Sequence, residues 1–234
     1  MKTVHPNLFI PGAAKSGTTS LHELLDVHPD ICMSTEKEPV FWNKNHTDHD
    51  RIVWYNSLFS DKEAKIMGES TTSYMYFPEF IDTIKTQYNE APKFIFILRN
   101  PIDRCYSHYW YLVGRGQEKK SFKESMAKDL NRPYENYGYV PDLYYHFGLY
   151  GQWIQRFYDA FGKTQIKIIT LEELIANKLR VVNDCFDFLG LEPLDSIPEI
   201  ASNSSYKLKY PKLYHFASKA ASGKYWFTKF AKVL

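Results

Sequence analysis

A short run of almost continuous apolar residues at 93–98 constrains the fold of this chain more than any other feature. Strands of this kind are buried on both faces, as in parallel sheets that are covered by helices on either side. Further short strand patterns occur at 7–10, 65–68 and 166–170. Helix patterns lie between and after them, at 18–27, 78–88, 101–113, 147–161, 171–176 and 179–189. This alternation predicts a three-layer α/β fold with a central parallel sheet flanked by helices.

The loop after the first predicted strand has the composition of an anion cradle. It reads Pro-Gly-Ala-Ala-Lys-Ser-Gly-Thr-Thr from residue 11 to residue 19 and leads into a helix. Gly12 and Gly17 allow tight turns, and the helix N-terminus presents backbone N–H groups to an anion. Lys15 adds a full positive charge, and Thr18 and Thr19 add hydroxyl donors. Because ligands of such sheets bind at the carboxyl ends of the strands, this loop is the first candidate site.

The order of residues in this loop argues against metal-dependent ATP chemistry. A nucleotide triphosphate loop places its lysine after the second glycine, whereas Lys15 precedes Gly17. The apolar strand at 93–98 ends in Arg99 and not in the aspartate that helps to hold Mg²⁺. A P-loop kinase of a small substrate therefore remains the alternative enzyme, and a catalytically silent nucleotide-binding module the alternative from another class.

Four segments in order carry a family resemblance. They are the loop at 11–21, Lys-Glu-Pro-Val-Phe-Trp at 37–42, Gly-Glu-Ser-Thr-Thr-Ser-Tyr at 68–74, and Leu-Arg-Asn-Pro-Ile-Asp-Arg-Cys-Tyr-Ser-His-Tyr at 98–109. Together they resemble the sulfotransferases that use PAPS (3′-phosphoadenosine 5′-phosphosulfate), and most of all the carbohydrate branch with the heparan sulfate sulfotransferase domains and bacterial relatives. The resemblance runs from about residue 8 to residue 209. It implies a P-loop-like fold, PAPS as donor, PAP as product and no metal.

The resemblance also implies which residues bind the donor. The 5′-phosphosulfate group would lie against Lys15, Ser16, Gly17, Thr18, Thr19 and Ser20. Arg99 and Ser107 would hold the 3′-phosphate, although Arg99 on its own could equally pair with Asp103. The segment at 203–209 lies where relatives carry a basic loop over the nucleotide, which assigns Tyr206, Lys207 and Lys209 to the donor site.

The reacting centre is expected near Lys15 and Glu38. By resemblance, Lys15 stabilises the leaving phosphate and Glu38 takes the proton of the acceptor. Aromatic neighbours at 41 and 42 would exclude water and raise the pKa of the Glu38 carboxyl group. Lys37 and Ser70 are expected at the acceptor or the sulfuryl group. The rival bases His46, His49 and His108 are interpreted as surface or structural residues, and no histidine or cysteine cluster predicts a metal site.

Partners and compartment follow from the remaining features. We expect a carbohydrate or another small hydroxyl or amine acceptor and no nucleic acid. The segment after Glu199 is basic and aromatic, which suggests weak contact with a membrane surface. Three scattered cysteines and the lack of a signal or spanning pattern predict the cytoplasm, although a soluble piece of a Golgi enzyme would look the same. Residues 1–234 are expected to form a single sulfotransferase domain, and whether it lacks a C-terminal helical segment of the family stays open.

Overall fold

The computed structural model describes residues 3–43, 47–60, 63–132 and 142–199. Its strands are β1 (Leu8–Ile10), β2 (Ile31–Met33), β3 (Ile66–Ser70), β4 (Lys93–Leu98) and β5 (Ile166–Thr170). All pairings are parallel, and the strands form one sheet in the order β2-β3-β1-β4-β5. This confirms the predicted α/β fold with a central parallel sheet, and β1 lies in the middle of that sheet.

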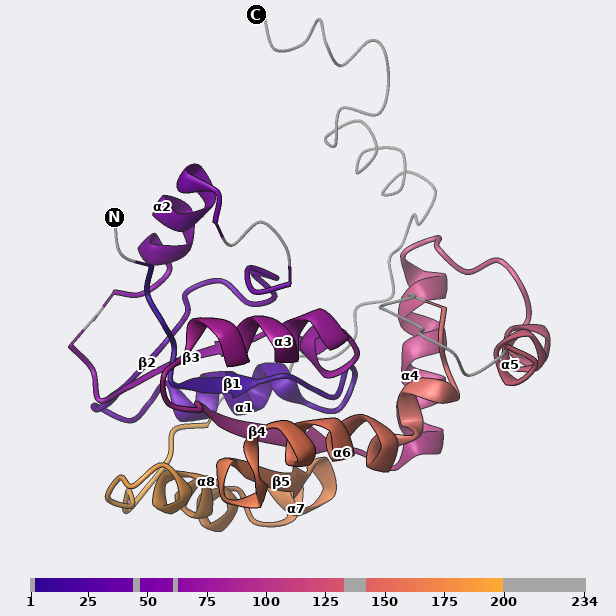
Figure 1. The fold of residues 1–234 in the computed structure, drawn as a ribbon. Coiled ribbons are helices and arrows are strands. Elements are labelled where there is room, and N and C mark those ends of the chain that lie inside the picture. Colours follow the sequence, from indigo (N-terminus) through magenta and orange to yellow (C-terminus); the bar gives the residue numbers. More distant parts are fainter. Residues whose placement is uncertain (1–2, 44–46, 61–62, 133–141, 200–234) are drawn as a thin grey trace, which may run out of the picture.

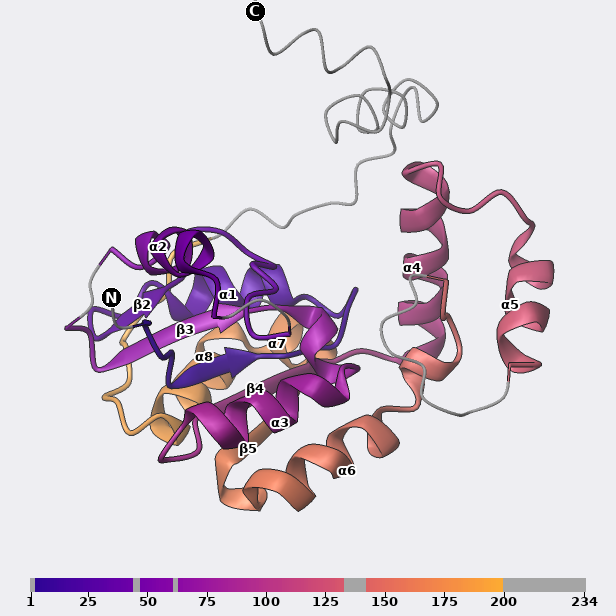
Figure 2. The ribbon, with the colours of Figure 1, turned by 45° about the horizontal axis from the view of Figure 1, so that its top comes forward.

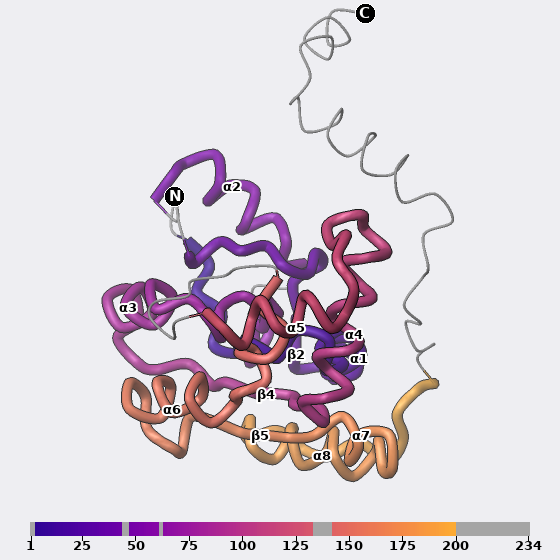
Figure 3. Tube along the Cα trace, turned by 90° about the vertical axis from the view of Figure 1, so that its right-hand side faces the viewer, coloured from indigo at the N-terminus to yellow at the C-terminus, as the bar shows by residue number. Residues whose placement is uncertain are grey.

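Helices cover both faces of the sheet (Figure 1). The helical elements include α1 (Thr18–Leu25), α2 (His49–Ser57), the 3₁₀ turn η1 (Thr72–Met75), α3 (Pro78–Gln87), α6 (Tyr150–Phe161), α7 (Leu171–Ala176) and α8 (Lys178–Phe188). Two further 3₁₀ turns are η2 (His146–Gly148) and η3 (Lys163–Gln165). From the side of α4 (Pro101–Gly114) and α5 (Phe122–Leu130), the elements from α6 to α8 lie along one edge of the molecule (Figure 3).

Alternating side chains of the strands divide the core into two layers. Leu8 and Ile10 of β1 point to one face and pack with α1, α7 and α8. Phe9 points to the other face, where its ring lies 5.4 Å from that of Phe80 on α3. The same alternation continues in β4, since Ile95 belongs to the first layer and the phenylalanines on either side of it to the second. A strand with both faces apolar is thereby buried on both sides.

Helices α4 and α5 stand to one side of these layers (Figures 1 and 2). They enclose a small core of their own, in which Tyr109 and Leu112 of α4 pack against Phe122 and Met126. Asn100 caps α4 by accepting hydrogen bonds from the N–H groups of the second and third helical residues, and Pro101 is the first helical residue, as the sequence predicted. The arm formed by α4 and α5 therefore extends directly from the carboxyl end of β4.

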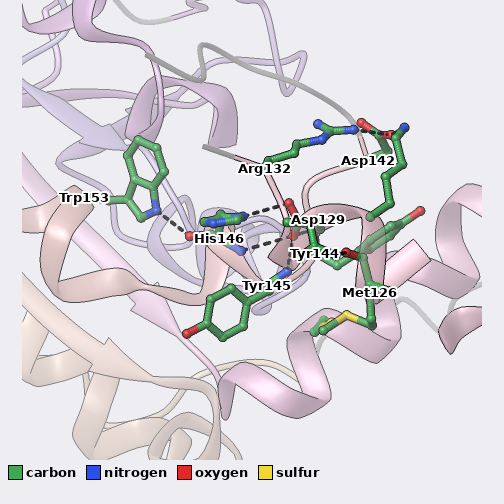
Figure 4. Close-up of polar contacts among 12 residues, drawn as sticks. Met126, Asp129, Arg132, Asp142, Tyr144, Tyr145, His146 and Trp153 are labelled. Carbon is green, nitrogen blue, oxygen red and sulfur yellow. Dashed lines mark hydrogen bonds and ion pairs between the residues drawn. The ribbon is translucent and has the colours of Figure 1, made fainter. Parts of the chain in front are cut away.

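A buried carboxylate attaches the chain after α5 to this arm (Figure 4). Asp129 is fully buried and accepts backbone N–H groups of Tyr144, Tyr145 and His146 at 2.8, 2.6 and 3.3 Å. Its second oxygen lies 2.8 Å from Nδ1 of His146, and the carbonyl of His146 accepts the indole N–H of Trp153 on α6 at 2.8 Å. This network fixes the path from the arm back to α6.

Candidate donor and transfer site

The predicted anion loop is attached to the carboxyl ends of two strands and to η1. The N–H of Ala13 donates to the carbonyl of Ile97 at 2.8 Å, and the N–H of Ile97 donates to the carbonyl of Gly12 at 3.0 Å. The N–H of Met75 donates to the carbonyl of Pro11, also at 3.0 Å. These three bonds attach the loop to the carboxyl-terminal edge of the sheet.

Gly17 directs the end of the loop into α1. It has a φ of 93°, a left-handed conformation that glycine adopts without strain, and no side chain caps the helix there. The first turn of α1 contains no acidic residue. No described side chain therefore competes with an anion for the N–H groups and the dipole at this helix end, where the sequence expects Thr18, Thr19 and Ser20 to bind one.

Two lysines converge on this helix end. Nζ of Lys37 donates to the hydroxyl groups of Thr19 at 2.9 Å and Thr18 at 3.3 Å, which places it at the anion loop itself. Burial lowers the pKa of Lys37 to about 8. The negative charge of Glu38 raises this pKa, and the positive charge of Lys15 lowers it. The pKa of Lys15 is also lowered, first by burial and then by Arg99 and Arg115.

No ion pair joins these cations to a carboxylate in the part of the chain that the structure describes, although the charges of Glu38 and Glu23 act on Lys37 from further away. Lys15, Lys37 and Arg99 form no ion pair with any described carboxylate. In particular, the alternative pairing of Arg99 with Asp103 is not observed. Unpaired buried or half-buried cations are costly, and an anionic ligand would remove that cost.

The predicted base Glu38 lies beside this cluster. Much of the Glu38 residue is exposed, but protein atoms surround its carboxylate, and this local burial raises the pKa of the carboxyl group. The charge of Lys37 and the hydrogen bonds from Thr72 oppose the rise. The carboxylate accepts the backbone N–H of Thr72 at 2.9 Å and the hydroxyl of Thr72 at 3.1 Å. Phe41 and Trp42, which were expected to shield it, are both buried in the core against Tyr55.

The predicted 3′-phosphate residues lie at the junction of β4 and α4. Arg99 follows the last residue of β4 and is half-buried, and its carbonyl accepts the hydroxyl of Tyr150 at 2.9 Å. Ser107 lies in the second turn of α4 and is also half-buried. Ser16 of the anion loop is fully buried. Tyr150 thus anchors the backbone at the end of β4 beside the predicted donor site.

Ser70 has a different environment from the one expected of an acceptor contact. It is fully buried at the end of β3, and its hydroxyl lies 2.8 Å from Nδ1 of His22. The other ring nitrogen of His22 lies 3.1 Å from the carbonyl of Ser34, so His22 carries its proton there and accepts from Ser70. Burial lowers the pKa of His22 to about 4, and Lys37 adds to this. Ser70 is therefore engaged with a neutral histidine.

Two residues that the sequence reasoning did not select join the cluster, Tyr111 of α4 and Arg115, the C-cap of that helix. Nζ of Lys15 lies 4.3 Å from the ring centre of Tyr111, and the guanidinium of Arg115 lies 5.1 Å from the same ring. Ser107, Tyr111 and Arg115 recur every four residues, which is a helical spacing visible in the sequence. That spacing could have identified them once Ser107 was chosen.

The structure does not describe all of the residues that the sequence singled out. Tyr206, Lys207, Lys209 and His46 lie outside the described residues. His49 is the first residue of α2, and His108 is buried in α4. The described residues contain no group of three histidine, cysteine or acidic side chains that is arranged to hold a metal, and none of their helices is long and apolar enough to cross a membrane.

Comparisons with known proteins agree with the fold and identify a family. The family model described as the sulfotransferase domain matches residues 5–229. Carbohydrate sulfotransferase 15 of Mus musculus is 26% identical over 261 residues, covering 86% of this chain and 46% of the relative. The bifunctional heparan sulfate N-deacetylase/N-sulfotransferase 1 of Mus musculus is 30% identical over 209 residues, covering 80% of this chain and 22% of the relative. The chain thus spans less than half the length of these curated relatives.

A solved bacterial structure extends the likeness over nearly the whole chain. The sulfotransferase from Alicyclobacillus acidocaldarius has a TM-score of 0.71 and 33% identity, and the match covers 93% of each chain. The resemblance drawn from the four sequence segments, including its carbohydrate branch, is confirmed. This chain belongs to the sulfotransferase family.

Proposed function

We propose that this chain transfers the sulfuryl group of PAPS to a hydroxyl or amine group of a carbohydrate. The observation that carries the proposal is a group of three cations that form no ion pair with a described carboxylate. Lys37 lies at the uncapped N-terminus of α1, and Lys15 of the anion loop lies near Arg99. Such a site suits a donor with several anionic groups. The neighbouring Glu38 carboxylate, with its raised pKa, adds a base to the same place.

Each residue has a role in this reaction. The acceptor oxygen or nitrogen attacks sulfur, and the bond from sulfur to the bridging oxygen breaks with its electron pair remaining on the 5′-phosphate of PAP. Lys15 and Lys37 stabilise the negative charge that develops on the leaving phosphate. Glu38 accepts the proton that the acceptor loses, and a raised pKa brings its basicity closer to neutral pH.

Donor specificity would come from Arg99 and Ser107. They lie where the family resemblance expects the 3′-phosphate, the group that distinguishes PAPS from ATP. Arg99 has a planar guanidinium group that can donate two parallel hydrogen bonds to phosphate. The absence of an Arg99–Asp103 pair in the described residues leaves this guanidinium without an acidic competitor there. Tyr206, Lys207 and Lys209 would complete the donor site from the segment outside the described residues.

Ligand-induced thermal stabilisation tests the donor. PAP at one hundred times its dissociation constant should add about 2.7 kcal/mol to the free energy of unfolding. At about 2–4 °C for each kcal/mol in a domain of this size, the melting temperature should rise by roughly 5–10 °C. Lys15→Ala should abolish most of the rise. A rise with ATP and Mg²⁺ but not with PAP would refute the donor assignment and favour the kinase alternative.

A transfer assay tests the acceptor. PAPS labelled in its sulfuryl group is offered with de-N-acetylated heparosan, with heparosan, or with 4-nitrophenol. The curated relatives are named as enzymes of carbohydrates, which supports label transfer to a polysaccharide. Transfer only to the phenol would contradict the carbohydrate acceptor. PAP binding with no transfer to any of the three would favour the silent binding module.

A further inference from the structure

The loop that carries Glu38 has an unfavourable backbone. Glu38 and Val40 have φ values of 58° and 51°, a left-handed conformation that side chains other than glycine rarely adopt. A branched residue such as Val40 is especially strained there. The loop can keep this shape only if surrounding groups hold it.

Three hydroxyl groups hold the loop through its N–H groups. The backbone N–H of Val40 donates to Oγ1 of Thr71 at 3.4 Å, and that of Trp42 donates to the hydroxyl of Tyr74 at 3.1 Å. The indole N–H of Trp42 donates to the hydroxyl of Tyr55 at 2.9 Å. These hydroxyl groups come from α2 and from the chain after β3, and each acts as an acceptor toward the loop.

All three hydroxyl groups turn their own protons toward one buried carboxylate. Glu69 is fully buried in β3 and accepts hydrogen bonds from Tyr55, from Thr71 at 3.1 Å, and from Tyr74. Since each hydroxyl already accepts an N–H of the loop, its hydrogen is free to point at Glu69. The titratable groups that face the carboxylate are Tyr55, Tyr74 and, more remotely, Tyr88 and Glu38.

We infer that Glu69 is a positioning residue, whose buried carboxylate orients three hydroxyl groups and thereby holds the strained loop on which Glu38 approaches the transfer site. This inference rests on the proposed role of Glu38 as the base. The loop is attached to β3 at its start as well, because the N–H of Glu38 donates to the carbonyl of Ser70 at 2.9 Å. Glu69 does not reach the reacting atoms and acts through the loop alone.

The geometry predicts that an amide cannot replace this carboxylate. Glu69→Gln keeps the size of the side chain but leaves one acceptor oxygen and adds an NH₂ donor. With three hydroxyl donors directed at the group, at least one hydroxyl then loses its acceptor, and the N–H of the loop bound to it is held less firmly. Tyr55→Phe removes one of the three links and should give a smaller effect of the same kind.

The test combines hydrogen exchange with kinetics at pH 8. Glu69→Gln should speed amide exchange in peptides covering residues 38–43 at least tenfold. It should also lower kcat at least tenfold, with PAPS and de-N-acetylated heparosan, while the dissociation constant of PAP changes less than twofold. A purely structural role would instead lower the melting temperature without separating kcat from PAP binding.

Asp129→Asn is the matched control, because Asp129 is an equally buried carboxylate that also collects several donors. It should speed exchange at residues 142–148 and leave residues 38–43 unchanged. The inference would be overturned if Glu69→Gln exchanged its amides at residues 38–43 at the wild-type rate. It would also be overturned if exchange there became faster while kcat stayed unchanged. If the wild-type chain transfers nothing from PAPS while Glu69→Gln still frees the loop, the proposed function fails and the anchoring of the loop by Glu69 is supported.

Discussion

Replacement of Gly17 by alanine tests whether the anion loop is built as described. Two costs add at this position. An alanine at φ 93° costs about 1–2 kcal/mol for the left-handed backbone. Its Cβ would also lie 2.7 Å from Cδ1 of Leu171 on α7, so that side chain must move at an overpacking cost of about 1–3 kcal/mol. The free energy of unfolding should therefore fall by about 2–5 kcal/mol.

Two other glycines separate these costs. Gly190 has a φ of 73°, but no atom lies within 4 Å of the point that a Cβ would occupy, so Gly190→Ala carries the backbone cost alone, about 1–2 kcal/mol. Gly151 lies in α6 with ordinary helical backbone and equally open surroundings. Gly151→Ala should be neutral or stabilising by up to about 1 kcal/mol, because alanine is the better helix former.

Urea unfolding and thermal melts of the three variants give the comparison. For a domain of this size the Gly17→Ala melting temperature should fall by roughly 4–20 °C, at about 2–4 °C for each kcal/mol. Its PAP-induced rise should also shrink, because the helix end no longer points at the anion. If Gly17→Ala is no more destabilising than Gly190→Ala, then Leu171 does not pack against the loop as the structure shows, and the reasoning is wrong.

Three further predictions concern titratable groups. Glu38→Gln should lower kcat by a factor of about 10²–10⁴ in steady-state kinetics and leave the affinity for PAP unchanged. The kcat of the wild type should fall as the pH drops below the raised pKa of Glu38, because the base is then protonated. The pKa of Lys37 is about 8, and a bound anion should raise it, so PAP binding should take up a proton near pH 8 and weaken at higher pH. Calorimetry in two buffers with different ionisation enthalpies measures the proton uptake, and Lys37→Met should abolish it. Burial raises the pKa of Glu69 from 4.5 to about 7, so between these values the native state holds a proton that the unfolded state has lost. The free energy of unfolding should therefore fall by about 3 kcal/mol as the pH rises from 4.5 to 7. Urea titrations should show this fall in the wild type and a smaller one in Glu69→Gln.

Much of the fold could be predicted because its signals are local. The strand at 93–98 has the predicted bounds, since a nearly continuous apolar run between polar ends admits few other structures. β2 was not predicted, because three residues show no periodicity and its place depends on pairing with β3. α2 and α5 were also missed, although their caps are visible in the sequence. Asp48 caps α2, and Ser121 with Glu124 forms a capping box at α5.

The composition of the site was predictable, but its contacts were not. The four segments identified the loop, Lys37, Glu38 and Arg99, because these residues keep a recognisable spacing. No spacing could show that Lys37 reaches Thr19 or that Glu38 reaches Thr72, since each pair is brought together only by the order of the strands. Ser70 illustrates the same limit, because its partner His22 lies on α1 and nothing local connects them.

Backbone strain is concentrated at the candidate site. Within the described residues, positive φ values occur in three residues other than glycine, Lys15, Glu38 and Val40, and all three lie in the two loops of the candidate site. At about 1–2 kcal/mol each, their cost is a substantial part of the roughly 5–15 kcal/mol that a typical domain retains. A buried, ionisable Glu69 adds a further cost above neutral pH. Such costs persist where the resulting geometry is needed. The left-handed backbone at Lys15 and Glu38 is therefore an argument for their proposed roles that does not depend on the sequence resemblance.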